Sequence, residues 1–376
     1  MKPMFFFGSL RDHELLEVVL GRAVAPRDLV AATAADRAAL TVHGEDYPFL
    51  AERPQSRAEG VVVQNLGDED LRRLIYFEEA EYGLDPITVE TPAGPVSALY
   101  FGSREKLAGH DRPWDFALWQ REARSVAIEA ARELMAHIDI TPVERMDDIW
   151  DGIKIRAVMR ARARAETPVT GALRQSRGAE DVQSLGVGRP YTRYFALEEH
   201  RLRHRRFDGD WSDEILRTVI TSGDAVTVVP YDPKRDEVLL IEQFRAPMYA
   251  RGDACPWAIE AIAGRIDKEL DAETAARREA EEEAGLTLGR MEQIAAYYAT
   301  PGFAAEHLTA FAAEADLSDK GGLFGLAGED EDIRAFTTSL DDAVQATSTG
   351  EINNGPAILS LLWLAQNRDR LRTVWA

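Results

Sequence analysis

The segment AGRIDKELDAETAARREAEEEAGL, Ala263–Leu286, constrains the chain more than any other stretch. On a helix, its Glu279, Glu282 and Glu283 stand at positions i, i+3 and i+4 and share one face, where like charges repel by a few tenths of a kcal/mol per pair. Two interpretations compete. The face is either a solvated acidic surface paired with the two arginines just before it, or a site for hard cations, which bind several carboxylate oxygens at once.

The surrounding spacing favours the cation site because it resembles the Nudix box. That pattern is a Gly, five residues, a Glu, seven residues, then Arg-Glu, an apolar residue, any residue, Glu-Glu, any residue, Gly and an apolar residue. The sequence matches it at Gly264 and from Arg278 to Leu286. One position departs, since Leu270 stands where the pattern has its first Glu. That position braces the loop in the family, so the departure bears on the loop's rigidity.

The resemblance implies a divalent cation, Mg²⁺ with Mn²⁺ as the alternative, bound by this acidic helix. It implies that Glu279 and Glu283 bind the metal directly and that the Ala263 carbonyl adds an oxygen. It also implies that Glu282 is a catalytic residue, which either binds the metal or contacts a residue that does. Such metals polarise a diphosphate and lower the pKa of a bound water. The implied reaction is hydrolysis of a nucleoside diphosphate linked to another group into two monophosphates.

The stretch ATPGFAAEH narrows the implied substrate. A proline about 16 residues beyond the box marks the Nudix subgroup that acts on ADP-ribose, and Pro301 stands there. A proline after a strand is also common without any function. The second half, from about Tyr191 to the C-terminus, resembles bacterial ADP-ribose pyrophosphatases throughout, for example in VVPYDPKRDEVLLIEQFRAP and GEINNGPAILSLLWL.

The stretch GEDEDI, taken alone, is typical of a polar surface loop. By the resemblance it brings a catalytic base, Glu329, and another metal ligand, Glu331. The i, i+2 spacing suits an extended loop with both carboxylates reaching toward one metal-water cluster. A base within hydrogen-bond reach of the attacking water completes such a mechanism.

The resemblance also implies a set of substrate contacts, each of which has an ordinary structural alternative. Arg245 would hold a phosphate or ribose group and Arg217 would supply another contact, across a dimer. Tyr194 would stack on adenine, and Glu260 and Glu306 match polar positions around the ribose and the lip of the site. The family usually exchanges the first strands of the Nudix domain across a homodimer, so we expect a homodimer here.

The first half opens with FFFGSLRDHELLE, which predicts a strand, a turn and a helix but lacks the lysine of a phosphate-binding loop. It resembles the opening motif of γ-glutamylcyclotransferase-like (AIG2-like) domains, with Phe7 in place of a Tyr. Glu78, in LIYFEEAEYGLDPITVET, matches the family's catalytic Glu, and Gly8, Ser9 and Leu10 could supply backbone N–H donors. The residue after Glu78 is Glu where the family tends to have Gly. The alternative is a domain kept for binding or dimerisation without turnover.

Together these motifs predict two α+β domains. Residues 1–165 form an AIG2-like mixed barrel with trailing helices, 166–189 a junction, and 190–376 a Nudix α/β/α sandwich with a mixed sheet. The combination resembles the tellurite-resistance Nudix proteins of bacteria, although no residue here speaks for tellurite chemistry. The rival functions are hydrolysis of another nucleoside diphosphate sugar, nucleotide sensing by a decayed box, and a cyclotransferase as the main activity. All five acidic positions of the Nudix site are present, which argues against decay.

Composition limits the other classes of function. The 376 residues carry a formal net charge of −21, which argues against nucleic acid as a partner because phosphates need a basic face. A single cysteine, Cys255, excludes a disulfide framework and fits a reducing, cytoplasmic location. No run of about 18 apolar residues appears, so we expect no membrane span.

Overall fold

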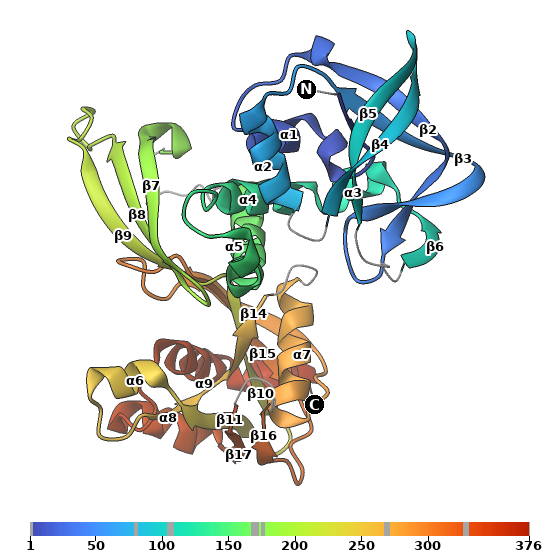
Figure 1. Cartoon of the computed structure of the whole chain (residues 1–376). Coiled ribbons are helices and arrows are strands. Elements are labelled where there is room, and N and C mark those ends of the chain that lie inside the picture. The colour runs from blue at the N-terminus through green and yellow to red at the C-terminus, as the bar shows by residue number, and fades with distance from the viewer. Residues whose placement is uncertain are drawn as a thin grey trace. The chain divides into compact units, whose positions relative to one another are not determined.

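The computed structural model of the chain describes residues 3–78, 82–103, 109–166, 173, 177–266, 271–325 and 331–375. The chain divides into two compact units, Met1–Val169 and Thr170–Ala376 (Figure 1). Each unit has its own hydrophobic clusters. The predicted domain boundaries at 165 and 190 stay a prediction. No helix within the described ranges is both long enough and apolar enough to cross a membrane.

The first unit is built on a closed five-stranded barrel with strand order β3-β1-β5-β4-β2 and a further pairing of β2 with β3. β1 and β5 run parallel, the other pairs are antiparallel, and β6 extends the sheet beyond β2. This is the mixed barrel that the sequence predicted. Its strands are β1 (Met4–Phe6), β2 (Leu29–Val42), β3 (Pro48–Val63), β4 (Tyr82–Thr91), β5 (Gly94–Ser103) and β6 (Gly109–Pro113).

Alternation along β1 sorts its side chains between two clusters, because successive residues of a strand point to opposite faces. Phe5 packs in a cluster contributed only by the barrel strands and their flanks. Met4 and Phe6 pack in a second cluster, which the helices share. A Cβ atom at Gly60 would lie 2.4 Å from the Phe5 ring, so glycine is needed there for the aromatic ring to fit.

The helices of the first unit pack on that second cluster. Gly21 directly after the apolar helical run predicts the end of the first helix, and that helix ends there with a left-handed φ of 67°. The helical apolar period of residues 112–138 predicts one helix, but the structure interrupts it at Ala123. The helices are α1 (His13–Leu20), α2 (Asp68–Glu78), α3 (Phe116–Glu122), α4 (Arg124–Met135) and α5 (Asp147–Ala165).

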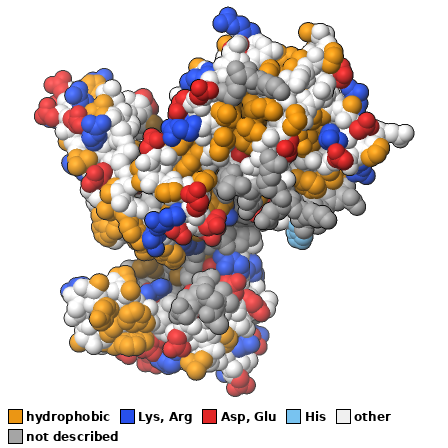
Figure 2. Space-filling view, in the orientation of Figure 1, with side chains coloured by type: hydrophobic (Ala, Val, Ile, Leu, Met, Phe, Trp, Pro, Cys, Tyr) orange, Lys and Arg blue, Asp and Glu red, His pale blue; other side chains and the backbone are white. Residues whose placement is uncertain are grey.

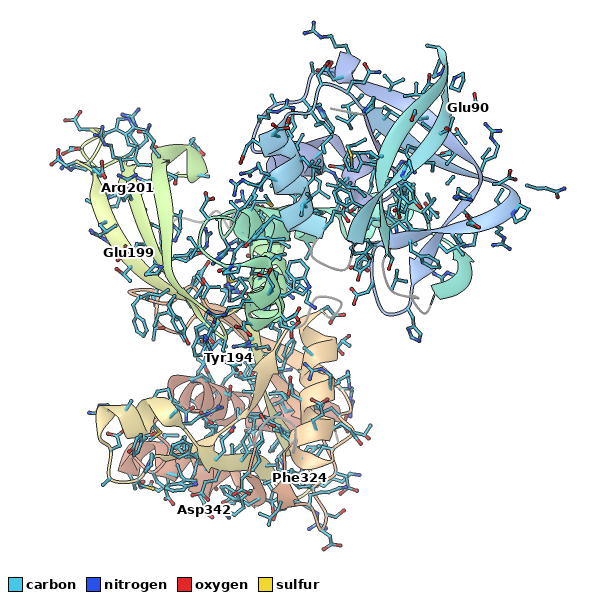
Figure 3. All side chains as sticks on the ribbon, viewed as in Figure 1. Glu90, Tyr194, Glu199, Arg201, Phe324 and Asp342 are labelled. Atoms are coloured by element: carbon cyan, nitrogen blue, oxygen red, sulfur yellow. The ribbon has the colours of Figure 1, made fainter. Side chains whose placement is uncertain are left out.

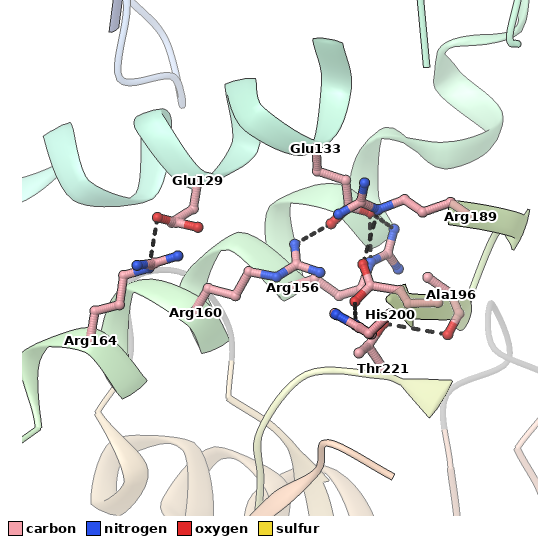
Figure 4. Close-up of polar contacts among 10 residues, drawn as sticks. Glu129, Glu133, Arg156, Arg160, Arg164, Arg189, Ala196, His200 and Thr221 are labelled. Carbon is pink, nitrogen blue, oxygen red and sulfur yellow. Dashed lines mark hydrogen bonds and ion pairs between the residues drawn. The ribbon is translucent and has the colours of Figure 1, made fainter. Parts of the chain in front are cut away.

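A buried ion pair joins α4 to α5 (Figure 4). Glu133 of α4 accepts from Arg156 of α5 at 2.6 Å, and both side chains have no exposed surface. Arg160, one turn further along α5, pairs with the other oxygen of the same carboxylate. The buried negative charge is therefore neutralised by cations that the chain itself supplies.

The second unit is an eight-stranded mixed sheet between helices, with β14-β15-β10-β11-β17-β16 as its main path. β12 pairs with β11 and β13 with β10, and β10 and β15 run parallel. The strands are β10 (Ala225–Asp232), β11 (Glu237–Phe244), β12 (Trp257–Glu260), β13 (Ile262–Arg265), β14 (Met291–Tyr298), β15 (His307–Glu314), β16 (Gly322–Phe324) and β17 (Ile333–Ser339).

Alternation along the central strands separates the two helical layers. Val226 and Val228 of β10 pack with α7 (Ala272–Ala284). Val229 and Tyr231 of the same strand pack with α8 (Leu340–Thr349) and α9 (Gly355–Trp375). The sheet therefore lies between helices on both faces, which confirms the predicted α/β/α sandwich.

A separate three-stranded antiparallel sheet precedes this sandwich in the sequence. It consists of β7 (Val182–Thr192), β8 (Ala196–His204) and β9 (Ile215–Thr221). Ile220 of β9 forms a parallel bridge with Ala304, which lies in the loop between β14 and β15. That bridge ties the small sheet to the loop that carries Pro301 and Glu306.

Candidate active site

Strand β13 and helix α7 form the centre of the site. The backbone N–H of Ala263 donates to the Glu283 carboxylate at 3.1 Å. A Cβ atom at Gly264 would lie 1.9 Å from the Glu279 carboxyl carbon, so only glycine lets this carboxylate approach the strand. Glu279 and Glu283 are both buried. The glycine that opens the motif and the glutamates that close it are therefore direct neighbours.

Arg278 occupies the same side of the helix as two of the acids. Its guanidinium pairs with Glu282 at 2.7 Å and with Glu279 at 2.8 Å, and it donates to the Arg265 carbonyl at 3.2 Å. Arg278 thus offsets part of the repulsion between the glutamates of this helix face. Its hydrogen bond to the Arg265 carbonyl also connects α7 to the end of β13.

Burial raises the pKa of Glu283 to about 8. The Ala263 N–H and Arg245 oppose this effect, whereas the negative charges of Glu279 and Glu331 add to it. A buried carboxylate beside two others is unfavourable in its charged form unless a cation joins it.

The donor chemistry fits a hard divalent cation, which prefers carboxylate oxygens. Among the described residues, no group of three or more His, Cys, Asp or Glu side chains is placed to hold a metal. In the described structure Glu279 pairs with Arg278, and Glu283 accepts from the Ala263 N–H. A cation would have to compete with these two contacts for the carboxylate oxygens.

Glu331 reaches the site from the connection between β16 and β17. Its charge acts on Glu283, and a Cβ atom at Gly325 would meet the Glu331 carbonyl oxygen at 2.5 Å. The site residues that fall outside the described part of the chain are Glu329, the predicted base, and Leu270, the departure from the motif. The role predicted for Glu329 stays a prediction.

Arg245 and Glu260 form one pair beside these carboxylates. The Arg245 Nε donates to the Glu260 Oε2 at 2.7 Å, and Arg245 is 40% exposed whereas Glu260 is only 17% exposed. Burial raises the pKa of Glu260, and Arg245 opposes that rise. Arg245 therefore offers an accessible guanidinium face, as a phosphate contact requires. It lies next to the glutamates Glu279, Glu282, Glu283 and Glu331, which are called the acid set below.

Glu306 belongs to the same electrostatic group. Burial raises its pKa, and the charges of Arg265 and Arg245 oppose the rise. Pro301 is exposed in the turn before Glu306. In this turn the Thr300 carbonyl accepts hydrogen bonds from the backbone N–H groups of Phe303 and Ala304. The structure thus brings Glu306 toward the site residues and gives Pro301 the place of a turn residue.

Tyr194 and Arg217 lie on the three-stranded sheet. Tyr194 is 65% exposed in the β7–β8 turn, and the guanidinium of Arg265 lies 3.6 Å from its ring centroid. Arg217 is exposed on β9 and donates to the carbonyl of Leu216. Within the described chain no contact joins Arg217 to the acid set, so its role across a dimer stays a prediction. The sequence did not predict that Arg265 contacts Tyr194 beside the site. Its position directly after Gly264, the first residue of the motif, was the one feature that could have indicated it.

In the first unit, Gly8, Ser9 and Leu10 form the turn between β1 and α1. Gly8 precedes the short 3₁₀ helix Ser9–Arg11, Leu10 is buried in the helical cluster, and a Cβ atom at Gly8 would lie 3.1 Å from Pro48. Glu78 is the last residue of α2, and residues 79–81 lie outside the described part. The predicted roles of these four residues stay predictions.

Two surface cavities of about 630 and 460 Å³ lie on the second unit, and the site glutamates line neither. The smaller is lined by Trp257, Leu323 and Arg334 among others. Figure 2 shows apolar side chains gathered at the lower left, over the part of this unit that holds α6 (Ala246–Arg251) and α8. Exposed aromatic residues in this region include Phe244 and Tyr249. Neither of these two cavities contains the site glutamates. The candidate site is therefore identified from the side-chain contacts described above.

Comparison with known proteins decides the family. Residues 221–357 match the family model described as NUDIX domain. The ADP-ribose pyrophosphatase of Escherichia coli K12 is 38% identical over 199 residues, which cover 53% of this chain and 95% of that enzyme. This chain belongs to the Nudix hydrolase family. The predicted enzyme class, Nudix hydrolase, is thereby confirmed. The family also supports hydrolysis of nucleoside diphosphate compounds as the general reaction of this chain.

Three further similarities were found. The GDP-mannose pyrophosphatase of Pectobacterium atrosepticum is 33% identical over 168 residues, 45% of this Nudix hydrolase and 86% of the relative. A solved structure entitled "Crystal structure of ADP compounds hydrolase" has a TM-score of 0.41 at 18% identity and covers 52% of this chain and 100% of that one. Residues 4–121 match the model for gamma-glutamyl cyclotransferase, AIG2-like, so the Nudix hydrolase carries an AIG2-like domain, as predicted.

Proposed function

We propose that the Nudix site hydrolyses the diphosphate of ADP-ribose, giving AMP and ribose 5-phosphate. The observation that carries the proposal is the buried Glu283, whose charge is opposed by Glu279 and Glu331 and which lies near the cationic Arg245. An anionic diphosphate bridged by a cation complements both features. The 38% identical relative acts on the same substrate by its name.

Glu279, Glu283 and Glu331 would hold the cation, and Glu282 would hold either the cation or one of these ligands. Mg²⁺ is the proposed ion, with Mn²⁺ as the alternative. When bound, such an ion polarises the diphosphate and lowers the pKa of a water. The carbonyl of Ala263 is proposed as a further oxygen donor, beside the N–H that already holds Glu283.

The chain's own groups supply binding and proton transfer. Arg245, kept in place by Glu260, binds a phosphate oxygen through its exposed face. Glu329 takes the proton of the attacking water, and Glu306 and Pro301 border the sugar. Tyr194 contacts the base, and Arg217 reaches the substrate of a partner subunit in a homodimer formed through the Nudix domain.

A second candidate substrate is another nucleoside diphosphate sugar, because a 33% identical relative is a GDP-mannose pyrophosphatase. A second candidate activity is cyclotransfer by the AIG2-like domain, with Glu78 as the base and the N–H groups of Gly8, Ser9 and Leu10 as donors. The match over residues 4–121 favours testing it.

The test is product release from ADP-ribose, ADP-glucose, GDP-mannose, NADH and diadenosine polyphosphates with Mg²⁺. Glu283→Gln is compared with Glu281→Gln, a matched control because Glu281 is exposed on the same helix. We expect ADP-ribose to be preferred, Glu283→Gln to lose at least about 100-fold in kcat and Glu281→Gln to stay near wild type. Preference for another compound would replace the substrate, and equal rates in both variants would remove Glu283 from the mechanism.

A further inference from the structure

Arg11, in the turn between β1 and α1, carries a largely buried charge that the chain neutralises only weakly. Its side chain is 19% exposed. Its ion-pair partner in the described structure is Glu59 of β3, which is 80% exposed and whose carboxylate lies 3.7 Å from the guanidinium, beyond hydrogen-bond distance. Burial lowers the pKa of Arg11, and Glu59 opposes this effect. Among the described residues, the buried Nε of Arg11 also has no hydrogen-bond partner. A buried cation with so little compensation costs free energy, which a bound anion would recover.

Other arginines of the first unit have close carboxylates. Arg22 donates to Asp70 at 2.7 and 2.8 Å. Arg37, which is 28% exposed, pairs at 3.0 Å with Glu52, which is 83% exposed. Exposure of the acid therefore does not prevent a close pair in this barrel. The loose contact of Arg11 is a property of its own site.

An aromatic ring holds the Arg11 guanidinium in place instead. The guanidinium lies 4.5 Å from the ring centroid of Phe116, the first residue of α3. Phe116 stacks on the buried Trp119, with centroids 5.7 Å apart and an angle of 11° between the rings. The Trp114 ring centroid lies 5.9 Å from that of Phe116. Because a guanidinium stacked on a ring keeps its plane and its edge of N–H donors, Arg11 is oriented before any ligand arrives.

The backbone of this turn is fixed as well. The Arg11 N–H donates to the Gly8 carbonyl at 3.1 Å, and Leu10 is buried among the helices. Figure 3 shows side chains filling the space between the helices and the barrel strands of this unit, which the turn connects. A cation on a fixed turn suits a binding site, because little conformational freedom is lost when a ligand binds.

We propose that Arg11 is a binding site for the carboxylate group of a small-molecule ligand. A carboxylate accepts two parallel N–H bonds from a guanidinium edge and brings one negative charge, which matches the single charge of Arg11. A phosphate dianion would bring two charges close to Glu59 and is therefore the poorer match. The half-buried ring of Phe116 offers contact to the body of the ligand. The site depends on neither of the two candidate activities proposed above.

The first test compares three ligands that share a ring and differ in the head group, namely benzoate, benzamide and phenyl phosphate. Binding to the full chain is followed by the ¹⁵N-labelled indole N–H signals of Trp114 and Trp119. Trp114→Phe and Trp119→Phe identify these two signals among those of the seven tryptophans.

We expect benzoate to bind at least about tenfold more tightly than benzamide, because the amide loses the charge-assisted pair. Phenyl phosphate should bind no more tightly than benzoate. Benzoate that leaves both signals unchanged, equal affinities for benzoate and benzamide, or tighter binding of phenyl phosphate at these signals would each overturn the proposal.

The second test assigns the preference to Arg11. Arg11→Met keeps an unbranched stem without the cation and should lose the preference for benzoate over benzamide. Arg37→Met is the matched control and should keep it, because Arg37 is a similarly exposed arginine of the same barrel that already has a close acid. A preference that survives in Arg11→Met, or that disappears equally in Arg37→Met, would overturn the proposal.

Glu59→Gln leaves Arg11 intact and decides the matter even if Arg11→Met does not fold. It removes the carboxylate that competes for the guanidinium, so benzoate affinity should rise about twofold or more at low ionic strength. A benzoate affinity that does not rise in Glu59→Gln would contradict a site centred on Arg11.

Discussion

Two buried glutamates in this chain have opposite surroundings. Glu133 of the first unit has no exposed surface and is paired with Arg156 and Arg160. Glu283 of the second unit is also buried, yet two further carboxylates, Glu279 and Glu331, act on it and raise its pKa. Burying a charge is costly unless it is paired. The first unit therefore supplies its own cations for Glu133, whereas in the second, by the proposed function, a cation from solution would neutralise Glu283 and its neighbours.

The largest effect is expected from the residue that lets the acids approach β13. Gly264→Ala would place a methyl group 1.9 Å from the Glu279 carboxyl carbon and displace that carboxylate. We expect hydrolysis to fall at least about 100-fold, because displacements of about 1 Å in a catalytic site cost that much. The measurement is kcat/KM for ADP-ribose.

The control for that substitution is Gly355→Ala. A Cβ atom at Gly355 would meet nothing within 4 Å, and this glycine begins α9. Near-wild-type activity in both alanine variants would show that the approach of Glu279 to β13 is irrelevant to catalysis.

The next effect concerns the buried pair of the first unit. Glu133→Gln would leave Arg156 buried without its carboxylate and should destabilise this unit by about 3–5 kcal/mol. Hydrogen exchange of α4 and α5 peptides measures the change locally, which suits a chain of two units. Glu122→Gln, at an exposed side chain, is the control and should change exchange little. Exchange that stays as slow in Glu133→Gln as in wild type would show that the pair does not hold these helices.

The smallest effect is a pH dependence in the first unit. Arg22 lowers the pKa of Asp70, which it contacts at 2.7 and 2.8 Å. Because the folded pKa lies below the unfolded one, the pair stabilises the fold above the unfolded pKa, and the contribution is lost as pH falls through the folded value. Asp70→Asn should therefore destabilise by about 1–2 kcal/mol near pH 7, and the difference should shrink as the pH falls below about 4. Acid and neutral urea titrations of both proteins measure this difference, and a constant gap at both pH values would refute it.

Much of the second unit could be predicted from sequence because its signals are local and periodic. The spacing of Gly264, Glu279 and Glu283 indicated one shared site, and the structure buries the glutamates next to that glycine. The end of α1 at Gly21 was predictable for the same reason, since only a few residues decide it.

Contacts between distant residues could not be predicted. Arg265 and Tyr194 are joined only because a strand and a turn of another sheet meet in space. Glu133 and Arg156 lie on different helices, and either residue alone is typical of an exposed helix surface. The break at Ala123 was missed as well, because apolar periodicity continues through α3 and α4.

The central contrast is between Glu133, which the chain itself neutralises, and Glu283, which by the proposed function an added cation would neutralise. Titration with Mn²⁺, followed by the electron paramagnetic resonance signal of the free ion, measures cation binding directly in wild type, Glu283→Gln and Glu281→Gln. The account predicts binding in wild type and Glu281→Gln and a loss of at least about tenfold in affinity in Glu283→Gln. Equal affinity in all three proteins would contradict it.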